Sequence, residues 1–202
     1  MAQQTFDLYQ RVTSLPAGKR IFSLLYAVKA PYFATVRPQV REVRANHAEL
    51  SIRNRKRVHN HIGTVHAIAI ANGMECAMGL LAEATTPDDM RWIPKGITLD
   101  YVAKTPGDIE CVAETSPEDW AKEPPFTVDV RMTGRLVKDG TVAVQGRSIV
   151  VLGEKGTVKV GGVAVNKIEH WEFEDKRPED EQILNSNYET ASVYGFGHPL
   201  YY

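Results

Sequence analysis

The sequence predicts an α+β domain in which an antiparallel sheet wraps around one long central helix. Residues 63–83 are apolar around most of the helix circumference, which is typical of a helix buried against a sheet. Residues 97–152 alternate between apolar and polar side chains, which is typical of strands with one buried face. The pair Asp139-Gly140 predicts a hairpin turn, so the strands on either side of it are expected to be antiparallel.

Two short amphipathic helices are expected at the N-terminus, within residues 5–29. Apolar side chains recur there at intervals of three and four, and the sequence Pro16-Ala17-Gly18 interrupts them. From residue 34 to residue 53 the pattern becomes that of β structure, with a turn around Asn46. We therefore expect two helices that pack as a flank or lid, followed by a hairpin or one long bent strand.

The long apolar helix is expected over residues 63–83, and a β meander follows it. The strands of this meander are predicted at 97–103, 109–113, 126–133 and 141–152. Residues 158–165 predict a small extra hairpin, and the acidic segment 171–202 predicts a tail that is partly ordered at best. The predicted organisation is an N-terminal helical flank (1–29), a main domain (30–153) and a C-terminal extension (154–202).

Composition argues against several classes of protein. The 202 residues include 24 Lys and Arg against 25 Asp and Glu, which lacks the basic excess of nucleic-acid binders. The longest apolar stretch, 21–28, is far shorter than the ~20 residues of a membrane span, so no span is expected. The two cysteines have no second Cys or His at zinc-ligand spacing. We therefore expect no metal site and a reducing compartment, the cytoplasm.

Charge is distributed unevenly along the chain. Residues 1–58 hold 11 basic and 3 acidic side chains, whereas residues 59–202 hold 13 and 22. A basic, amphipathic N-terminus can resemble an organellar presequence, which leaves an organellar matrix as an alternative location. Because the basic residues continue through Arg57, well past a cleavable segment, they are expected to line one surface of the folded domain.

The most informative polar residue is Glu75, in the middle of the predicted apolar helix. A carboxylate among Met74 and Met78 faces a large desolvation cost unless it has a partner or a water-filled cleft. Asn72 precedes it by three residues, so both are expected to project from the same side of the helix. Two interpretations remain open: Glu75 is a general base in a site, or it is a paired, structural carboxylate.

The residues that lead into this helix resemble a known family. The run Asn60-x-x-Gly63-Thr64-x-His66-Ala67, with an acid nine residues after His66, resembles the signature of hotdog-fold acyl-CoA thioesterases of the phenylacetate-pathway type. The resemblance covers about residues 30–153. It implies the hotdog fold, a sheet wrapped around a central helix, and a homodimer or homotetramer. Many relatives have His-Gly-Gly at this place and some have a Ser where this chain has Pro94, so it is closer to a poorly characterised branch.

The resemblance also implies roles for individual residues in thioester hydrolysis. The backbone N–H of Ala67, in the first turn of the helix, would stabilise the oxyanion. Glu75 would act as general base or nucleophile across a dimer interface, and Asn60 would position the water or the substrate carbonyl. His66 is either catalytic or a helix cap. Substrate contacts are also expected from Gly63, Thr64 and Asn72.

Coenzyme A would enter as part of the substrate, with no cofactor required. Basic side chains near the loop and the strand ends are candidates for binding its phosphates, although surface cations are commonly only solvated: Arg55, Lys56, Arg57, Lys95 and Lys104. The sequence contains no P-loop and no G-x-S-x-G elbow, which excludes a serine α/β-hydrolase. The alternatives are a non-catalytic module that binds acyl-CoA or an apolar ligand, a hydratase, and acyl transfer or cyclisation on a thioester.

Overall fold

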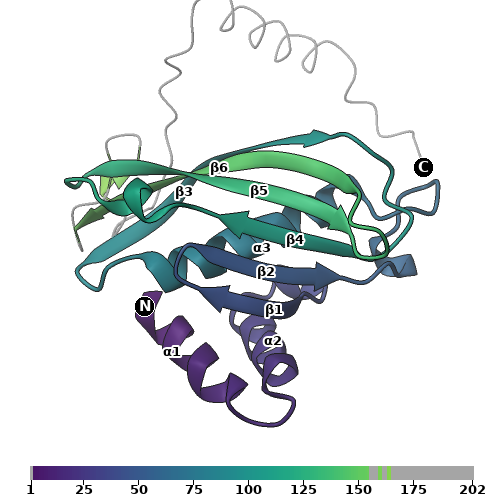
Figure 1. The fold of residues 1–202 in the computed structure, drawn as a ribbon, viewed down its shortest axis with the longest axis horizontal. Helices are drawn as coiled ribbons and strands as arrows, with labels where there is room; N and C mark the ends of the chain where they lie inside the picture. Colours follow the sequence, from purple (N-terminus) through teal and green to yellow (C-terminus); the bar gives the residue numbers. More distant parts are fainter. Residues whose placement is uncertain (1, 155–158, 161–162, 165–202) are drawn as a thin grey trace, which may run out of the picture. The chain divides into compact units, whose positions relative to one another are not determined.

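The structure, a computed structural model, describes residues 2–154, 159–160 and 163–164 (Figure 1). Contacts divide the chain into two compact units, 1–158 and 159–202. In the second unit, β7 (Lys159–Val160) and β8 (Val163–Ala164) pair antiparallel, which confirms the predicted extra hairpin. The predicted acidic tail lies outside the described residues.

A six-stranded antiparallel sheet forms most of the first unit. Its strands lie in the order β1-β2-β4-β5-β6-β3. In chain order they are β1 (Gln39–Arg44), β2 (His47–Ile52), β3 (Met90–Tyr101), β4 (Ile109–Glu114), β5 (Phe126–Leu136) and β6 (Val142–Glu154). The predicted turn at Asp139-Gly140 joins β5 to β6, and Gly140 has a φ of 73°. The predicted meander is therefore confirmed for β4, β5 and β6, whereas β3, expected to be its first strand, pairs with β6 and not with β4.

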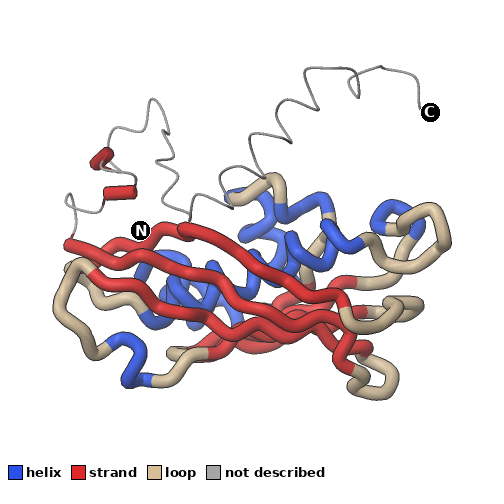
Figure 2. Tube along the Cα trace, turned by 90° about the horizontal axis from the view of Figure 1, so that it is seen from above, coloured by secondary structure: helices blue, strands red, loops and turns tan. Residues whose placement is uncertain are grey.

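The helix α3 (Ala67–Thr85) crosses one face of this sheet, as Figures 1 and 2 show. Every residue of its second half from Cys76 to Ala82 is buried. The strands supply buried side chains at every second position of their inner face, among them Leu50, Val130 and Leu152. One helix enclosed by an antiparallel sheet confirms the predicted α+β class.

The first half of α3 is less buried than expected for a helix enclosed on nearly all sides. Ile68 is 59% exposed, Glu75 is exposed and Ala71 is partly exposed, and the three lie along one stripe of the helix. Of the described helices, α3 alone has the length and apolar composition of a membrane span. Of that stretch, 61% is buried inside the protein, as in the core helix of a soluble domain.

The N-terminal helices α1 (Ala2–Thr13) and α2 (Gly18–Lys29) form the predicted flank and pack against α3 and β1. The Ser23 hydroxyl accepts the Val40 N–H at 2.9 Å. The two helices meet so closely that a Cβ at Gly18 would lie 1.9 Å from the carbonyl oxygen of Val12. Only glycine fits this contact without displacing α1.

The strands β1 and β2 form a hairpin, one of the two alternatives predicted for residues 34–53. Its turn is at Asn46, whose φ of 64° lies in the left-handed region that asparagine tolerates. The first strand begins at Gln39 and not at residue 34, because Phe33–Thr35 form a short 3-10 helix, η1.

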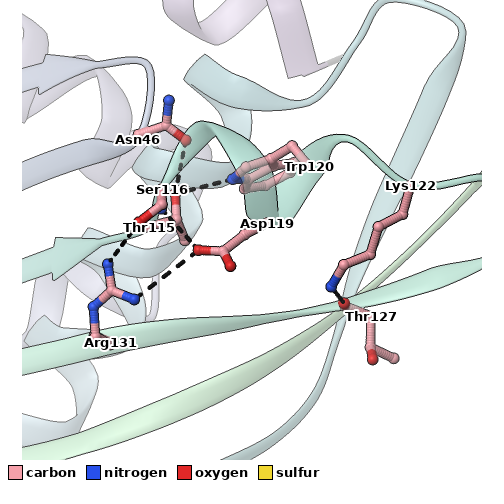
Figure 3. Close-up of polar contacts among 8 residues, drawn as sticks. All are labelled: Asn46, Thr115, Ser116, Asp119, Trp120, Lys122, Thr127 and Arg131. Atoms are coloured by element: carbon pink, nitrogen blue, oxygen red, sulfur yellow. Dashed lines mark hydrogen bonds and ion pairs between the residues drawn. The ribbon is translucent and has the colours of Figure 1, made fainter.

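A polar network at this turn fixes the C-terminal end of α3. The Thr115 hydroxyl donates to Asn46 Oδ1 at 2.9 Å and accepts from Trp120 Nε1 at 2.9 Å (Figure 3). Trp120 belongs to the short helix η3 (Pro117–Trp120), which follows β4. The Asn46 N–H donates to Thr85 Oγ1 at 2.9 Å, so the last turn of α3 is tied to the β1–β2 turn.

The expectation of one buried face is wrong for β3 in the single chain. This strand lies at the sheet edge, paired only with β6, and most of its residues are exposed on both faces. Ile97 and Tyr101 are each 46% exposed. The other edge strand, β1, is covered by α2, whereas β3 leaves a long row of backbone hydrogen-bonding groups unpaired within the described chain.

Candidate active site

A cavity of about 410 Å³ opens at the N-terminal end of α3. The loop before the helix, its first residues and the segment after β3 line it. Of the residues predicted from the sequence, it brings together Asn60, Thr64, Ala67 and Lys104. The other lining residues are Ile62, Val65, Ile70, Tyr101, Val102, Ala103 and Thr105. A largely apolar wall with a few polar groups is typical of a small-molecule site.

The Asn60 side chain shapes the loop at this cavity. Its Oδ1 accepts the N–H groups of Ile62 and Thr64, both at 3.1 Å, and its Nδ2 donates to Thr64 Oγ1 at 2.8 Å. Gly63 has a φ of 80°, which favours glycine, and its N–H donates to the Asn60 carbonyl at 3.1 Å. The motif therefore encodes a tight loop. Contact of Asn60, Gly63 or Thr64 with a substrate stays a prediction.

The helix begins at Ala67 and not near Gly63, because the residues between them pair with other segments. His59 and Val65 form a β-bridge. The Val65 N–H donates to the Thr105 carbonyl at 3.0 Å, and the Thr105 hydroxyl donates to the Val65 carbonyl at 2.9 Å. These bonds hold the loop extended up to the first turn of α3.

His66 caps the helix by accepting one backbone N–H of the first turn. Its Nδ1 accepts the Ile68 N–H at 3.0 Å, so the cap is the observed role and a catalytic role stays a prediction. The Ala67 N–H has no acceptor among the described residues, and Ala67 lines the cavity. An unbonded N–H at the positive end of a helix attracts negative charge.

Tyr101 is a cavity residue that the sequence analysis missed. Its hydroxyl donates to the Ala67 carbonyl at 3.0 Å, which ties the end of β3 to the first turn of α3. Burial raises the pKa of this phenol. A signal was present: Tyr101 ends an apolar alternation with Ile97 and Leu99, and it is the member of that run with a polar tip.

Glu75 lies apart from the cavity of its own chain. The eight residues from Ala67 to Glu75 correspond to ~12 Å along the helix axis. The Glu75 side chain is exposed, and no hydrogen bond or ion pair joins it to another residue of the described chain. The desolvation cost that the apolar helix predicted for the Glu75 carboxylate is therefore absent in the single chain.

The expectation that Asn72 and Glu75 project from the same side of the helix is wrong. Asn72 is 5% exposed and donates from Nδ2 to the Tyr32 carbonyl at 3.3 Å and to Thr35 Oγ1 at 3.2 Å. Its Oδ1 is buried without a partner among the described residues. Side chains three residues apart on a helix point in directions that differ by about 60°. This difference suffices to place Asn72 under η1 and Glu75 at the surface.

The carboxylate of α3 that burial does affect is Glu83. Burial raises the pKa of Glu83, while hydrogen bonds from Thr5 and Trp92 and the charge of Lys29 lower it in part. Its Oε2 is buried with no hydrogen-bond partner in the described chain. Lys29 Nζ donates to Thr5 Oγ1 at 2.9 Å, so this network joins α1 and α2 to the end of α3.

The cations predicted to bind phosphate are dispersed. Lys104 is exposed and lines the cavity, whereas Lys95 lies six residues before the end of β3, ~20 Å along the strand from Tyr101. Lys56 and Arg57 are exposed in the short helix η2 (Lys56–Val58). Arg55 lines a different cavity beside α2. The structure therefore places one of the five predicted cations at the mouth of the Ala67 cavity.

One group of metal-ligand type side chains occurs in the described chain, on the outer face of the sheet. Ligand atoms of Glu42, His47 and Glu49 lie within 4.8 Å of one another. His47 Nδ1 lies 3.6 Å from Glu114 Oε1, and burial together with Glu110 raises the pKa of Glu49. Glu42 pairs with Arg44, and none of the three side chains lines the cavity.

A family model matches the part of the sequence that contains the cavity and Glu75. A family model described as a domain of unknown function, DUF4442, matches residues 18–151, which include the cavity and Glu75. The chain belongs to the DUF4442 family. The DUF4442 region begins at the first residue of α2, so α1 precedes it.

Solved structures resemble this DUF4442 chain over most of their length. A structural-genomics protein is 36% identical, with a TM-score of 0.65 over 76% of this chain and 98% of its own. A Pseudomonas aeruginosa protein named a probable thioesterase is 18% identical, with a TM-score of 0.60 over 69% and 97%. A Haemophilus influenzae thioesterase is 8% identical, with a TM-score of 0.53 over 69% and 87%.

These likenesses confirm the hotdog fold expected from the motif, a six-stranded antiparallel sheet around a central helix as in thioesterases. Among curated proteins, none has a sequence that matches the chain.

Proposed function

We propose that this DUF4442 protein is an acyl-CoA thioesterase that acts as a dimer. The observation that carries the proposal is the Ala67 N–H, which has no acceptor among the described residues and belongs to a residue that lines the cavity at the positive end of α3. The same fold occurs in proteins named thioesterases. A fixed donor of this kind suits a reaction in which negative charge develops on a carbonyl oxygen.

In the proposed reaction, water adds to the thioester carbonyl and the Ala67 N–H stabilises the oxyanion that forms. The tetrahedral intermediate then expels the coenzyme A thiolate, which takes up a proton, and a carboxylate is the second product. Tyr101 and His66 are positioning residues in this scheme, since the Tyr101 bond to the Ala67 carbonyl and the His66 cap hold the first helical turn. Donors held rigidly before the reaction need no reorganisation during it.

The group that activates the water is Glu75 of the partner subunit in this proposal. Within one chain Glu75 is ~12 Å from Ala67 along the helix, too far for both to act on one carbonyl. One helical turn after Glu75, a Cβ at Gly79 would lie 3.5 Å from the Trp92 ring of β3. The exposed stripe of α3 therefore runs beside β3, so a second copy paired with the free β3 edge would approach Glu75.

The acyl chain and the coenzyme A phosphates each need a binding surface on the protein. We place the acyl group in the apolar part of the cavity, against Val65 and Ile70, and a phosphate near the exposed Lys104. Four further cations would contact the coenzyme A phosphates where the partner subunit brings its own cavity toward them: Arg55, Lys56, Arg57 and Lys95.

The deciding experiment is a screen of acyl-CoA thioesters of increasing chain length, with thiol release recorded by a chromogenic disulfide. The expected result is turnover of at least one thioester by the wild-type dimer and its loss in Glu75→Gln. Glu123→Gln, which neutralises an exposed carboxylate outside the site, is the matched control and should retain activity.

A folded dimer that releases no thiol from any thioester would refute the proposal. Calorimetric binding of the same acyl-CoA without turnover would then favour the non-catalytic binding module. That alternative has one observation in its favour, since the polar atoms of the Asn60 side chain bond to its own loop.

A further inference from the structure

Helix α2 has two apolar stripes, and only one of them packs inside the protein. Its inner face buries Phe22 and Tyr26. Leu24 is 67% exposed and Val28 is 73% exposed on the outer face. The full set of exposed apolar side chains, which we call the outer stripe, recurs at helical spacing and extends beyond both ends of the helix: Leu15, Ile21, Leu24, Leu25, Val28 and Tyr32. A contiguous apolar surface of this kind marks an interaction site.

A strongly basic groove adjoins the outer stripe. This cavity of about 800 Å³ lies between α2, the start of β1 and the segment after β2, and Leu15 and Leu24 contribute to its wall. Its cations, which define the basic groove, are Lys19, Arg20, Arg37, Arg41, Arg53 and Arg55. No acidic side chain lines it, and none of the six forms an ion pair within the described chain.

The surrounding sequence does not neutralise this charge. Residues 8–41 contain six Lys and Arg and no Asp or Glu. The carboxylate that follows, Glu42, has its pKa lowered mainly by Arg44, with which it pairs at 2.7 Å, and only in small part by Lys19. Leu15 and Leu24 join the apolar stripe to the positive groove, and among the described residues the groove lacks counter-charges of its own.

We propose that the outer stripe and the basic groove form a peripheral binding surface for an anionic phospholipid bilayer. The aliphatic side chains enter the boundary between headgroups and acyl chains, and the cations contact lipid phosphates. A second copy of the chain fits less well, because a symmetric interface would bring two basic grooves together. A nucleic acid would neutralise the cations but would leave the aliphatic stripe in water.

Vesicle sedimentation with the full chain tests this proposal. Roughly tenfold more protein should sediment with vesicles that contain phosphatidylglycerol than with phosphatidylcholine vesicles, and high salt should abolish the difference. Two variants address the two parts of the surface: Leu24→Ser with Val28→Ser, and Lys19→Glu with Arg20→Glu. Each pair should lower binding roughly tenfold. Val137→Ser is the matched control, since Val137 is 53% exposed at the end of β5 and outside this surface.

Three results would overturn the proposal, provided that circular dichroism shows folded variants. The first is equal binding to both vesicle types, or binding to neither at low salt. The second is self-association that Leu24→Ser with Val28→Ser abolishes, without vesicle binding, which would assign the stripe to a second copy. The third is tight binding of a duplex oligonucleotide that these serine substitutions leave unchanged. The vesicle assay involves no thioester, so its outcome is independent of the proposed activity.

Discussion

The two ends of α3 differ in how completely the protein buries them and satisfies their hydrogen bonds. At the C-terminal end, Cys76–Ala82 are all buried, and the Thr85 hydroxyl accepts the Asn46 N–H of the neighbouring turn. At the N-terminal end, Ile68 is exposed and the Ala67 N–H has no acceptor in the described chain. One helix thus serves wholly as core from Cys76 to Ala82, whereas its first half buries Ile70 and Met74 on one side and exposes Ile68 and Glu75 on the other.

The two carboxylates of α3 show the same difference. Glu83 is partly buried, and Thr5, Lys29 and Trp92 lower in part the pKa that burial raises. Glu75, two turns earlier, is exposed and has no hydrogen bond or ion pair among the described residues. A carboxylate that neighbours already hold contributes to structure, whereas an unpartnered one is free to meet a substrate or a second subunit. The absence of an internal partner, and not burial, distinguishes the candidate catalytic acid.

The largest expected effect follows from removing the unpartnered carboxylate. Glu75→Gln keeps the size of the side chain and its hydrogen bonding but cannot accept a proton, so kcat should fall roughly 10²–10⁴-fold. The rate of thiol release from one acyl-CoA substrate measures this change in kcat. Because Glu75 is exposed, the variant should keep the fold and its oligomeric state. Unchanged turnover on a good substrate would remove Glu75 from the mechanism.

Removing the free donor at the N-terminal end should have the next largest effect. Ala67→Pro deletes the N–H, and proline suits a first helical position that follows an extended residue such as His66, whose ψ is 139°. Losing one oxyanion donor costs about 2.7–4 kcal/mol of transition-state stabilisation, a roughly 10²–10³-fold lower kcat. Ala67→Gly retains the donor and should remain active. A folded Ala67→Pro dimer with wild-type kcat would place the oxyanion elsewhere.

Mixing the two inactive variants tests whether the site is shared between subunits. In a Glu75→Gln and Ala67→Pro heterodimer, one site has both Glu75 and the Ala67 N–H, and the other has neither. Random exchange of subunits should therefore restore about a quarter of the wild-type activity. Activity that stays at the level of the separate variants after complete exchange would contradict a shared site.

The smallest expected effect concerns Glu83 and the pH dependence of stability. Burial raises the pKa of Glu83 in the folded protein, so its contribution to the unfolding free energy is present at acid pH and is lost as pH rises through the raised pKa. Glu83→Gln lacks this contribution. The wild-type minus variant difference, measured by urea unfolding at several pH values, should therefore decrease from acid to neutral pH.

Asp139 provides a control of opposite sign for that measurement. Hydrogen bonds from Thr141 lower the pKa of Asp139, so its contribution is present at neutral pH and is lost as pH falls through the lowered pKa. The difference between wild type and Asp139→Asn should therefore decrease toward acid pH. A Glu83 difference that follows the same direction as that of Asp139 would contradict the assigned role of burial.

Most of the fold could be predicted because its signals are local and periodic. The alternation of Val128, Val130 and Met132 predicted their shared buried face in β5, and Asp139-Gly140 predicted the turn. The same alternation in β3 did not predict its exposure. Periodicity shows which side chains share a face, but it does not show whether another element covers that face.

The candidate site was predicted in position more than in detail. The motif around Asn60 and Ala67 located the cavity, because its turn and helix-start residues act through bonds a few positions away. Glu83 was overlooked, since its burial depends on α1 and α2, which pack there from a distant part of the chain. Tyr101 was missed for a similar reason: its bond to Ala67 joins positions 34 apart in the sequence.

The cap at the start of α3 also restricts which acid–base chemistry the His66 ring can perform. Since Nδ1 accepts the Ile68 N–H, the lone pair of that nitrogen is committed and the ring proton belongs on Nε2. The neutral tautomer is thereby fixed by the backbone. A ring in this state presents an N–H outward and can donate a hydrogen bond from it. Because the cap uses the Nδ1 lone pair, His66 is suited to donate a hydrogen bond from Nε2.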